Sequence, residues 1–279
     1  MNKQLWCIFL FVLVCTTPAA AETAMIAASA DSIVNANDPN AVLSNSTELL
    51  ASKQGGAFGG IGDVSTDLRM FYVQFELPGG LTGQDMLSLN DVQLKLTRSS
   101  TANFRLNYYV YGVFDGLDSA SVDTLNWNSG VGTDPLHNEV RFGTPDEISY
   151  YHDPAEAAFV GNIRTANDEG PNALPNPPIS VHGPFDFTIQ AQSPTAVSNL
   201  HNLILNDTDG RLTFFVGIQQ NFGIATANLF ASIENDTFDP PTLCIDFVRI
   251  PEPSGLLLAV CGLVGLMGQA WRRAKRGVC

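Results

Sequence analysis

The sequence predicts an all-β protein whose sheets stack as a β-sandwich, and two observations favour that fold class. Apolar residues recur at every second position through much of the middle of the chain, which is typical of strands that bury one face. Short clusters rich in glycine, proline, asparagine and aspartate separate these stretches, as turns do between strands. Because each sheet buries one face, a second layer has to cover that face, and a sandwich supplies it.

The alternation defines about nine expected strands. It is clearest where Val92, Leu94 and Leu96 alternate with polar side chains. In chain order, the expected strands are residues 32–34, 48–51, 71–76, 91–97, 104–111, 185–189, 212–218, 229–234 and 243–247.

Two stretches are expected to be helical at most. Asp153 precedes Pro154, a pair typical of a helix N-terminus, and residues 157–160 would continue that helix. Residues 195–205 place apolar side chains on one helical face, and Thr195 would cap this second helix.

Residues 22–250 form the expected β-sandwich domain, and a long insertion interrupts it. The insertion covers about residues 132–184, which are rich in glycine, proline, asparagine and aspartate, and is expected at one end of the sandwich. The end segments, residues 1–21 and 251–279, have a different composition and are expected to serve export and sorting.

Residues 1–21 are expected to be a signal peptide. Lys3 supplies a short positive region, residues 5–14 form an apolar core, and three alanines at 19–21 offer a small-residue cleavage site. The apolar run is too short to span a bilayer comfortably, which favours a cleaved signal.

Charge and cysteine content limit the possible partners. The chain has 28 acidic and 14 basic residues, a net charge of −14, and five of the basic residues lie in the end segments. Such an acidic domain repels phosphate backbones, so no nucleic acid is expected as a partner. Cys244 is the one cysteine of residues 22–250, so no disulfide is expected within that domain.

The C-terminal segment is the most specific feature of the chain. Pro251, Glu252 and Pro253 precede an uncharged stretch at residues 255–270, which predicts one transmembrane helix with Trp271 at the interface. Basic residues follow directly and predict that this end of the helix faces the cytoplasm. These residues are Arg272, Arg273, Lys275 and Arg276.

The order of triplet, apolar helix and basic tail resembles the PEP-CTERM sorting signal. The resemblance implies that an integral-membrane exosortase is a partner and cuts the chain near the triplet. It also implies that the exported protein is first anchored in the inner membrane by its C-terminal helix and then reaches the cell surface or extracellular matrix. A plain membrane anchor is the alternative.

The domain between the ends resembles DNRLRE-type domains, which are related to carbohydrate-binding module family 96. The resemblance rests on residues 69–75 (Arg-Met-Phe-Tyr-Val-Gln-Phe) followed by 92–96 (Val-Gln-Leu-Lys-Leu). Weaker matches follow in the family's order at residues 109–113, 124–128, 231–234 and 240–245. The family implies a jelly-roll-like β-sandwich that is secreted, surface-bound or attached to polysaccharide-active enzymes. It also implies a structural role for Trp127, which is expected in the core.

No motif in the sequence points to an enzyme. Neither HExxH nor GxSxG occurs, and the four histidines stand apart from one another in the chain. We therefore expect a non-enzymatic surface or matrix protein that is associated with extracellular polysaccharide. A specific carbohydrate-binding module is one alternative, and a polysaccharide lyase or hydrolase on a jelly-roll scaffold is another, since glycosidase chemistry needs only two suitably placed carboxylates.

Two features are candidates for ligand contacts. Tyr109 and Tyr111 share one face of an expected strand and could stack on sugar rings, although burial in the sandwich is the alternative. Residues 206–210 (Asn-Asp-Thr-Asp-Gly) resemble the start of a calcium loop, but position 216 holds Val216 where an EF-hand would need glutamate. We expect instead a strand-joining turn with Gly210 at positive φ. The sequence assigns no cofactor and no metal ligand, and calcium binding remains an alternative.

Overall fold

The computed structural model describes residues 21–54, 67–99, 107–133, 155–164, 184–188, 193–218 and 229–250. The chain divides into two units, Glu22–Phe247 on the one hand and Met1–Ala21 with Val248–Cys279 on the other. Of the second unit only residues 21 and 248–250 are described, so the account below concerns the first unit.

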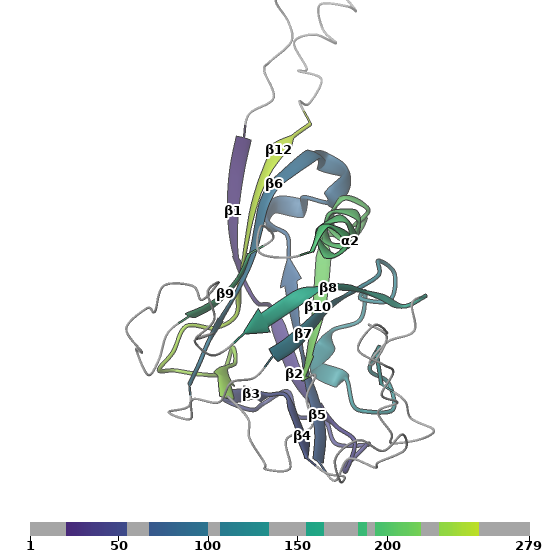
Figure 1. Cartoon of the computed structure of the whole chain (residues 1–279), viewed down its shortest axis with the longest axis vertical. Helices are drawn as coiled ribbons and strands as arrows, with labels where there is room; N and C mark the ends of the chain where they lie inside the picture. Colours follow the sequence, from purple (N-terminus) through teal and green to yellow (C-terminus); the bar gives the residue numbers. More distant parts are fainter. Residues whose placement is uncertain are drawn as a thin grey trace, which may run out of the picture. The chain divides into compact units, whose positions relative to one another are not determined.

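Strands make up most of the described residues (Figure 1). The strands are β1 (Ala21–Ala27), β2 (Ala30–Asn35), β3 (Glu48–Leu50), β4 (Ser52–Gln54), β5 (Asp67–Glu76), β6 (Met86–Thr97), β7 (Asn107–Val113), β8 (Ala157–Arg164), β9 (Pro184–Thr188), β10 (Arg211–Ile218), β11 (Leu229–Ala231) and β12 (Thr242–Arg249). Short 3-10 turns η1 (Pro78–Gly80), η2 (Gly83–Asp85) and η3 (Val122–Thr124) and the helix α2 (Pro194–Leu205) complete the elements.

The strands form two principal sheets and one small pair. One sheet has the order β1-β12-β6-β9, and the larger sheet has the order β2-β5-β10-β7-β8, with β4 also paired to β5. The small pair joins β11 to β3. In the larger sheet every one of these neighbours runs antiparallel. The expected all-β class is thereby confirmed for the described residues.

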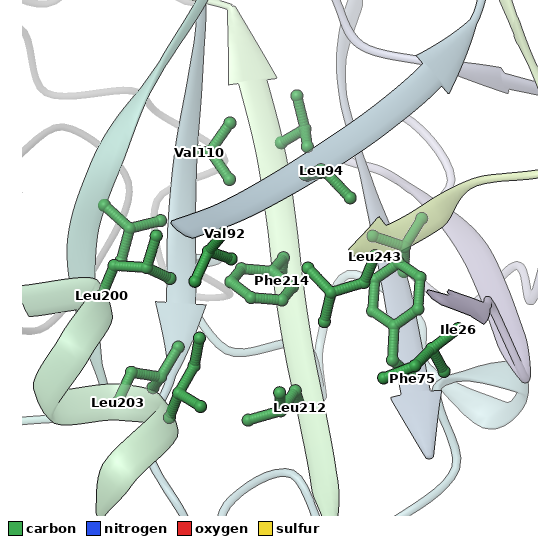
Figure 2. Close-up of a cluster of buried hydrophobic side chains, with 14 of the residues drawn as sticks. Ile26, Phe75, Val92, Leu94, Val110, Leu200, Leu203, Leu212, Phe214 and Leu243 are labelled. Carbon is green, nitrogen blue, oxygen red and sulfur yellow. The ribbon is translucent and has the colours of Figure 1, made fainter. Parts of the chain in front are cut away.

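A hydrophobic core joins the two principal sheets (Figure 2). Val92 and Leu94 of β6 contribute to it from one sheet, together with Leu243 of β12. Phe75 of β5 and Phe214 of β10 contribute from the other, with their ring centroids 6.2 Å apart. Each such side chain contributes roughly 1.5–3 kcal/mol when it is fully buried. Alternation therefore places the core residues as the sequence predicted.

The larger sheet is covered on its other face as well. Tyr72 and Gln74 lie on the expected polar side of β5, yet their exposed fractions are 0% and 2%. A second core forms there, against the segment that contains η3 and Trp127. Its buried members are Ala30, Val34, Ala36, Met70, Tyr72, Tyr111, Val113, Val122, Trp127, Ala157 and Phe215. The expected burial of Trp127, which is 2% exposed, is confirmed.

The helix expected near residue 200 is present and completes one side of the main core. It begins at Pro194 and not at the expected cap Thr195, because the side chain of Ser193 accepts a hydrogen bond from the backbone N–H of Ala196. Leu200 and Leu203 of α2 point toward the strands in Figure 2 and belong to the main core.

The prediction of the other helix, at residues 157–160, is wrong. These residues belong to β8, which pairs antiparallel with β7 across a register shift between Val110 and Tyr111. An open edge of β7 supplies backbone partners, and Phe159 packs its ring at 5.6 Å from that of Tyr111. These contacts outweigh the weak helical preference of a short segment. Part of the expected insertion at 132–184 is therefore a strand of the larger sheet.

No helix among the described residues combines the length and the apolar character that a membrane crossing needs. The expected transmembrane segment at 255–270 lies outside the described residues, as do residues 1–20 of the expected signal peptide.

Candidate functional site

Two loops that are far apart in sequence bring three carboxylates together. The loop after β7 carries Asp115 and Asp118, and the loop between α2 and β10 carries Asp209. One carboxylate oxygen from each residue lies within 4.8 Å of the oxygens of the other two. We call these three residues the acidic loop cluster. Asp207 lies in the second loop and adds to the negative potential around Asp118.

A buried glutamine holds the first loop in place. The Nε2 of Gln74 donates to the backbone carbonyls of Asp118, at 2.9 Å, and Ala120, at 3.0 Å. It also donates to Oγ1 of Thr213 on the neighbouring strand, at 3.0 Å. The loop is thus bonded to the larger sheet, and the buried carbonyl of Asp118 finds a partner.

Asp207 organises the second loop. Its Oδ2 accepts hydrogen bonds from the backbone N–H groups of Gly83, at 3.2 Å, and Gly210, at 3.1 Å. Gly210 has a φ of 78°, which confirms the expected positive value and suits glycine. The turn joins a helix to a strand, however, and not two strands, because residues 194–205 form α2.

Hydrogen bonds also connect the loops to each other and to β10. Thr208 Oγ1 donates to Oδ2 of Asp115 at 2.6 Å, which links the two loops directly. The backbone N–H of Arg211 donates to Oδ1 of Asp209 at 3.0 Å. The guanidinium of Arg211 donates to the carbonyl of Ser119 and lies 3.5 Å from the carboxylate of Glu76. The guanidinium of Arg211 is thus already paired with Glu76, which is not one of the three aspartates.

Burial acts strongly on two of these acids. Asp118 is 4% exposed, and its Oδ1 has no hydrogen-bond partner among the described residues. Burial raises the pKa of Asp118 to about 7, and the charges of Asp209, Asp115 and Asp207 add to the effect. Burial also raises the pKa of Asp207 to about 6, although its two backbone hydrogen bonds act in the opposite direction. Both carboxyls are therefore costly to ionise without a positive partner.

A third buried acid lies elsewhere in the fold. Asp31 of β2 is 1% exposed, and its Oδ2 accepts a 2.8 Å hydrogen bond from the backbone N–H of Ile233. Burial raises its pKa to about 7, and the charges of Glu234 and Asp123 contribute. Asp31 fastens β2 to the turn after β11, which gives it a structural role.

The sequence pattern at residues 206–210 points to the second loop, whereas no pattern points to the first. Asp115 and Asp118 carry no motif, and they are separated from Asp209 by about 90 positions of sequence. What brings them together is the placement of β10 next to β7, a long-range pairing that no local pattern contains.

The two tyrosines considered for sugar stacking differ in the structure. Tyr111 is fully buried in the second core, where its ring stacks on Phe215 with centroids 4.9 Å apart and planes inclined by 11°. Tyr109 is partly exposed, and the edge-to-face contact with Phe159 has a centroid distance of 5.5 Å. Tyr111 is therefore a core residue, and the pair does not form an open platform.

The remaining residues singled out in the sequence are mostly outside the described part of the chain. His201 lies on α2 and is partly exposed, whereas the other three histidines are not described. The sorting-signal residues are not described either; they are Pro251, Glu252, Pro253, Arg272, Arg273, Lys275 and Arg276.

No protein-family model matches the chain, and no curated protein matches it in sequence. The resemblances to the PEP-CTERM signal and to DNRLRE-type domains stay predictions that rest on the residues quoted for them.

Proposed function

We propose that this chain is an exported, exosortase-processed and non-enzymatic protein of the cell surface or extracellular matrix, where it is associated with extracellular polysaccharide. The observation that carries the proposal is the order of three features: the Pro251-Glu252-Pro253 triplet, the uncharged stretch at 255–270 and the basic cluster behind Trp271.

The chemistry of that segment supports a sorting role. The prolines keep the backbone out of helix and extended, which suits recognition by a peptidase at the membrane surface. The apolar stretch provides the membrane helix, and the basic cluster after it keeps that end on the cytoplasmic side. The triplet would then lie at the outer interface, where an exosortase could cut.

The proposed passenger is a jelly-roll-like β-sandwich of the DNRLRE type. Two antiparallel sheets that share one core support this proposal, as do the motif residues 69–75 and 92–96, which fall in β5 and β6. Burial of Tyr111 leaves the candidate glycan platform on β7 without its second ring, so we favour general matrix association over a dedicated carbohydrate-binding site.

Mass spectrometry of the exported protein tests the sorting proposal. In a strain with a working exosortase, the mature chain is expected to end near Pro251-Glu252-Pro253. Replacement of the four basic residues by alanine is expected to impair this processing, since the helix loses its cytoplasmic anchor. A matched variant keeps the charge by exchanging each lysine for arginine and each arginine for lysine, and it is expected to be processed normally. An intact C-terminus through Cys279 would leave only a membrane anchor.

A second measurement tests the passenger's proposed role. The exported protein is incubated with extracellular polysaccharide from the same cells, and both co-sedimentation and newly released reducing ends are followed. Co-sedimentation without new reducing ends is the expected result. Release of reducing ends would show a hydrolase or lyase and contradict the non-enzymatic proposal.

A further inference from the structure

The acidic loop cluster has the geometry of a cation site. Calcium binds oxygen ligands at about 2.4 Å, so two oxygens that share one ion lie at most about 4.8 Å apart. One oxygen each of Asp115, Asp118 and Asp209 satisfies this limit with the other two. Among the described residues, hydrogen bonds engage Oδ2 of Asp115 and Oδ1 of Asp209, which leaves a second oxygen on each for a ligand.

A second observation points to a ligand. Oδ1 of Asp118 is buried and has no hydrogen-bond partner among the described residues, while its carboxylate lies within the cluster. The backbone N–H of Asp118 bonds its own carboxylate, but a buried carboxylate with an unpaired oxygen is still costly, and proteins hold such groups by pairing them or by coordinating a metal. The nearby guanidinium of Arg211 does not fill this role, because it binds Ser119 and Glu76.

We propose that Asp115, Asp118 and Asp209 bind a calcium ion, which fastens the loop after β7 to the loop between α2 and β10. The ligands are carboxylate oxygens and no nitrogen or sulfur donor belongs to the cluster, which selects a hard cation. They come from two separate loops, an arrangement that suits the variable coordination of calcium better than the strict octahedron of magnesium. This proposal does not depend on the proposed function.

The site differs from the calcium loop that residues 206–210 alone would form. Only Asp209 of that segment belongs to the cluster, while Asp207 directs its Oδ2 to Gly83 and Gly210 and thus shapes the loop. Two of the three ligands come from a loop about 90 positions earlier. Binding would therefore tie together strands β7 and β10 at their ends and is expected to stabilise the folded chain.

The full-length chain, purified in mild detergent and stripped of metal with a chelator, provides the test. Calcium chloride is titrated into it by calorimetry at a pH of about 7.5, and thermal unfolding is followed with and without calcium. We expect saturable binding of one ion and a rise in the unfolding temperature of several degrees. The Asp118→Asn and Asp209→Asn variants are expected to weaken the affinity about tenfold or more, because each removes a charged ligand.

The direction in which Asp118→Asn changes the unfolding temperature distinguishes a cation site from a purely structural role. Without calcium, Asp118→Asn is expected to unfold at the same or a higher temperature than the unaltered chain, because it removes a buried charge. With calcium the order is expected to reverse. The control is Asp246→Asn on β12, which makes the same charge change in the other sheet and is expected to retain full binding.

Three results would overturn the proposal. The first is no saturable binding at millimolar calcium, and the second is equal affinity in Asp118→Asn, Asp209→Asn and the control. The third is stabilisation by acidification alone, with calcium causing no shift at any pH. In that third outcome the cluster holds no cation, and protonation of buried carboxyls such as Asp118 and Asp31 accounts for the stabilisation.

Discussion

The side-chain nitrogen of Gln74 donates a 2.9 Å hydrogen bond to the backbone carbonyl of Asp118, so a buried residue of β5 positions a loop 44 residues away. The same nitrogen reaches Ala120 in that loop and Thr213 on the adjacent strand. Gln74 thereby bonds the loop of Asp115 and Asp118 to the sheet, and Arg211 of β10 adds a second bond to that loop at Ser119.

Replacement of Gln74 by leucine is expected to lower the free energy of unfolding by roughly 1–3 kcal/mol, since the buried carbonyl of Asp118 loses its donor and the more exposed carbonyl of Ala120 loses one as well. Urea denaturation measures this change. The control is Gln93→Leu, because the hydrogen bond that the Gln93 side chain makes within the described part of the chain is a local one to Asp91, and its loss is expected to cost less than about 1 kcal/mol. Equal effects of the two variants would contradict the anchoring role of Gln74.

Trp127→Ala is expected to destabilise the protein by roughly 3–5 kcal/mol, because it removes a large side chain of the second core and leaves a cavity. Chemical denaturation monitors the change by circular dichroism, since the variant lacks this fluorophore. Leu117→Ala serves as the control because Leu117 is 49% exposed and its truncation is expected to be nearly neutral. Unchanged stability of Trp127→Ala together with lost polysaccharide binding would indicate a ligand platform instead.

Gly83→Ala is expected to cost about 3 kcal/mol or more, because a Cβ at this position would lie 1.8 Å from the carbonyl oxygen of Ile204. A backbone atom cannot move aside as a flexible side chain can. The comparison is Gly79→Ala, where φ is 68° and nothing lies within 4 Å, so only about 1 kcal/mol of backbone strain is expected. Thermal unfolding measures the stability of both variants. An equal loss in the two would contradict the close approach of Gly83 to the carbonyl oxygen of Ile204.

The pH dependence of stability follows from the buried acids. Burial raises the pKa values of Asp31 and Asp118 to about 7, well above the usual range of an aspartate, so the folded chain binds more protons than the unfolded chain between about pH 4 and 7. Stability from these groups is therefore present at low pH and is lost as the pH rises through 7. In a chelator, the free energy of unfolding is expected to be higher near pH 5 than near pH 8.

The double variant Asp31→Asn, Asp118→Asn tests which groups are responsible. Asp31 faces Glu234 and Asp123, and Asp118 faces the other members of its cluster, so in both places a neutral amide replaces a carboxyl among like charges. We expect the variant's free energy of unfolding to depend much less on pH over this range. Urea denaturation at several pH values measures this dependence. If the free energy of unfolding of the variant changes with pH as much as that of the unaltered chain, other acids of the chain are responsible.

Local alternation was sufficient to predict much of the fold. Val92, Leu94 and Leu96 are all buried, and each expected strand overlaps an observed one, although residues 232–234 of the expected strand 229–234 belong to the turn after β11. The alternation failed on β5, whose expected polar face is covered by the second core. A loop layer provides that cover, and its docking depends on Gln74 and on the hydrogen bond from Tyr72 to the carbonyl of Val131.

Edge strands were the hardest elements to predict. β1 exposes Met25 at 74% and buries only Ile26, so its sequence carries almost no alternation. β8 forms because it pairs with the otherwise open edge of β7, a strand about 45 residues earlier in the chain. The local sequence of β8 does not contain this partner. The acidic loop cluster was missed for a similar reason, since Asp118 and Asp209 meet only after β10 has inserted beside β7.

The strand order of the larger sheet also determines when this chain can fold. β10 lies between β5 and β7, although it follows both by about 100 residues or more of sequence, so neither has its inner neighbour until residue 218 is available. Closing such long loops costs entropy before any contact forms, which predicts slow folding, in milliseconds to seconds. Fragments that end before Arg211 would expose Phe71, Val73 and Phe75 on an incomplete sheet and would be prone to aggregate. The apolar residues of β5, in the first third of the chain, therefore become covered only when β10, in the last third, has been synthesised and has paired with it.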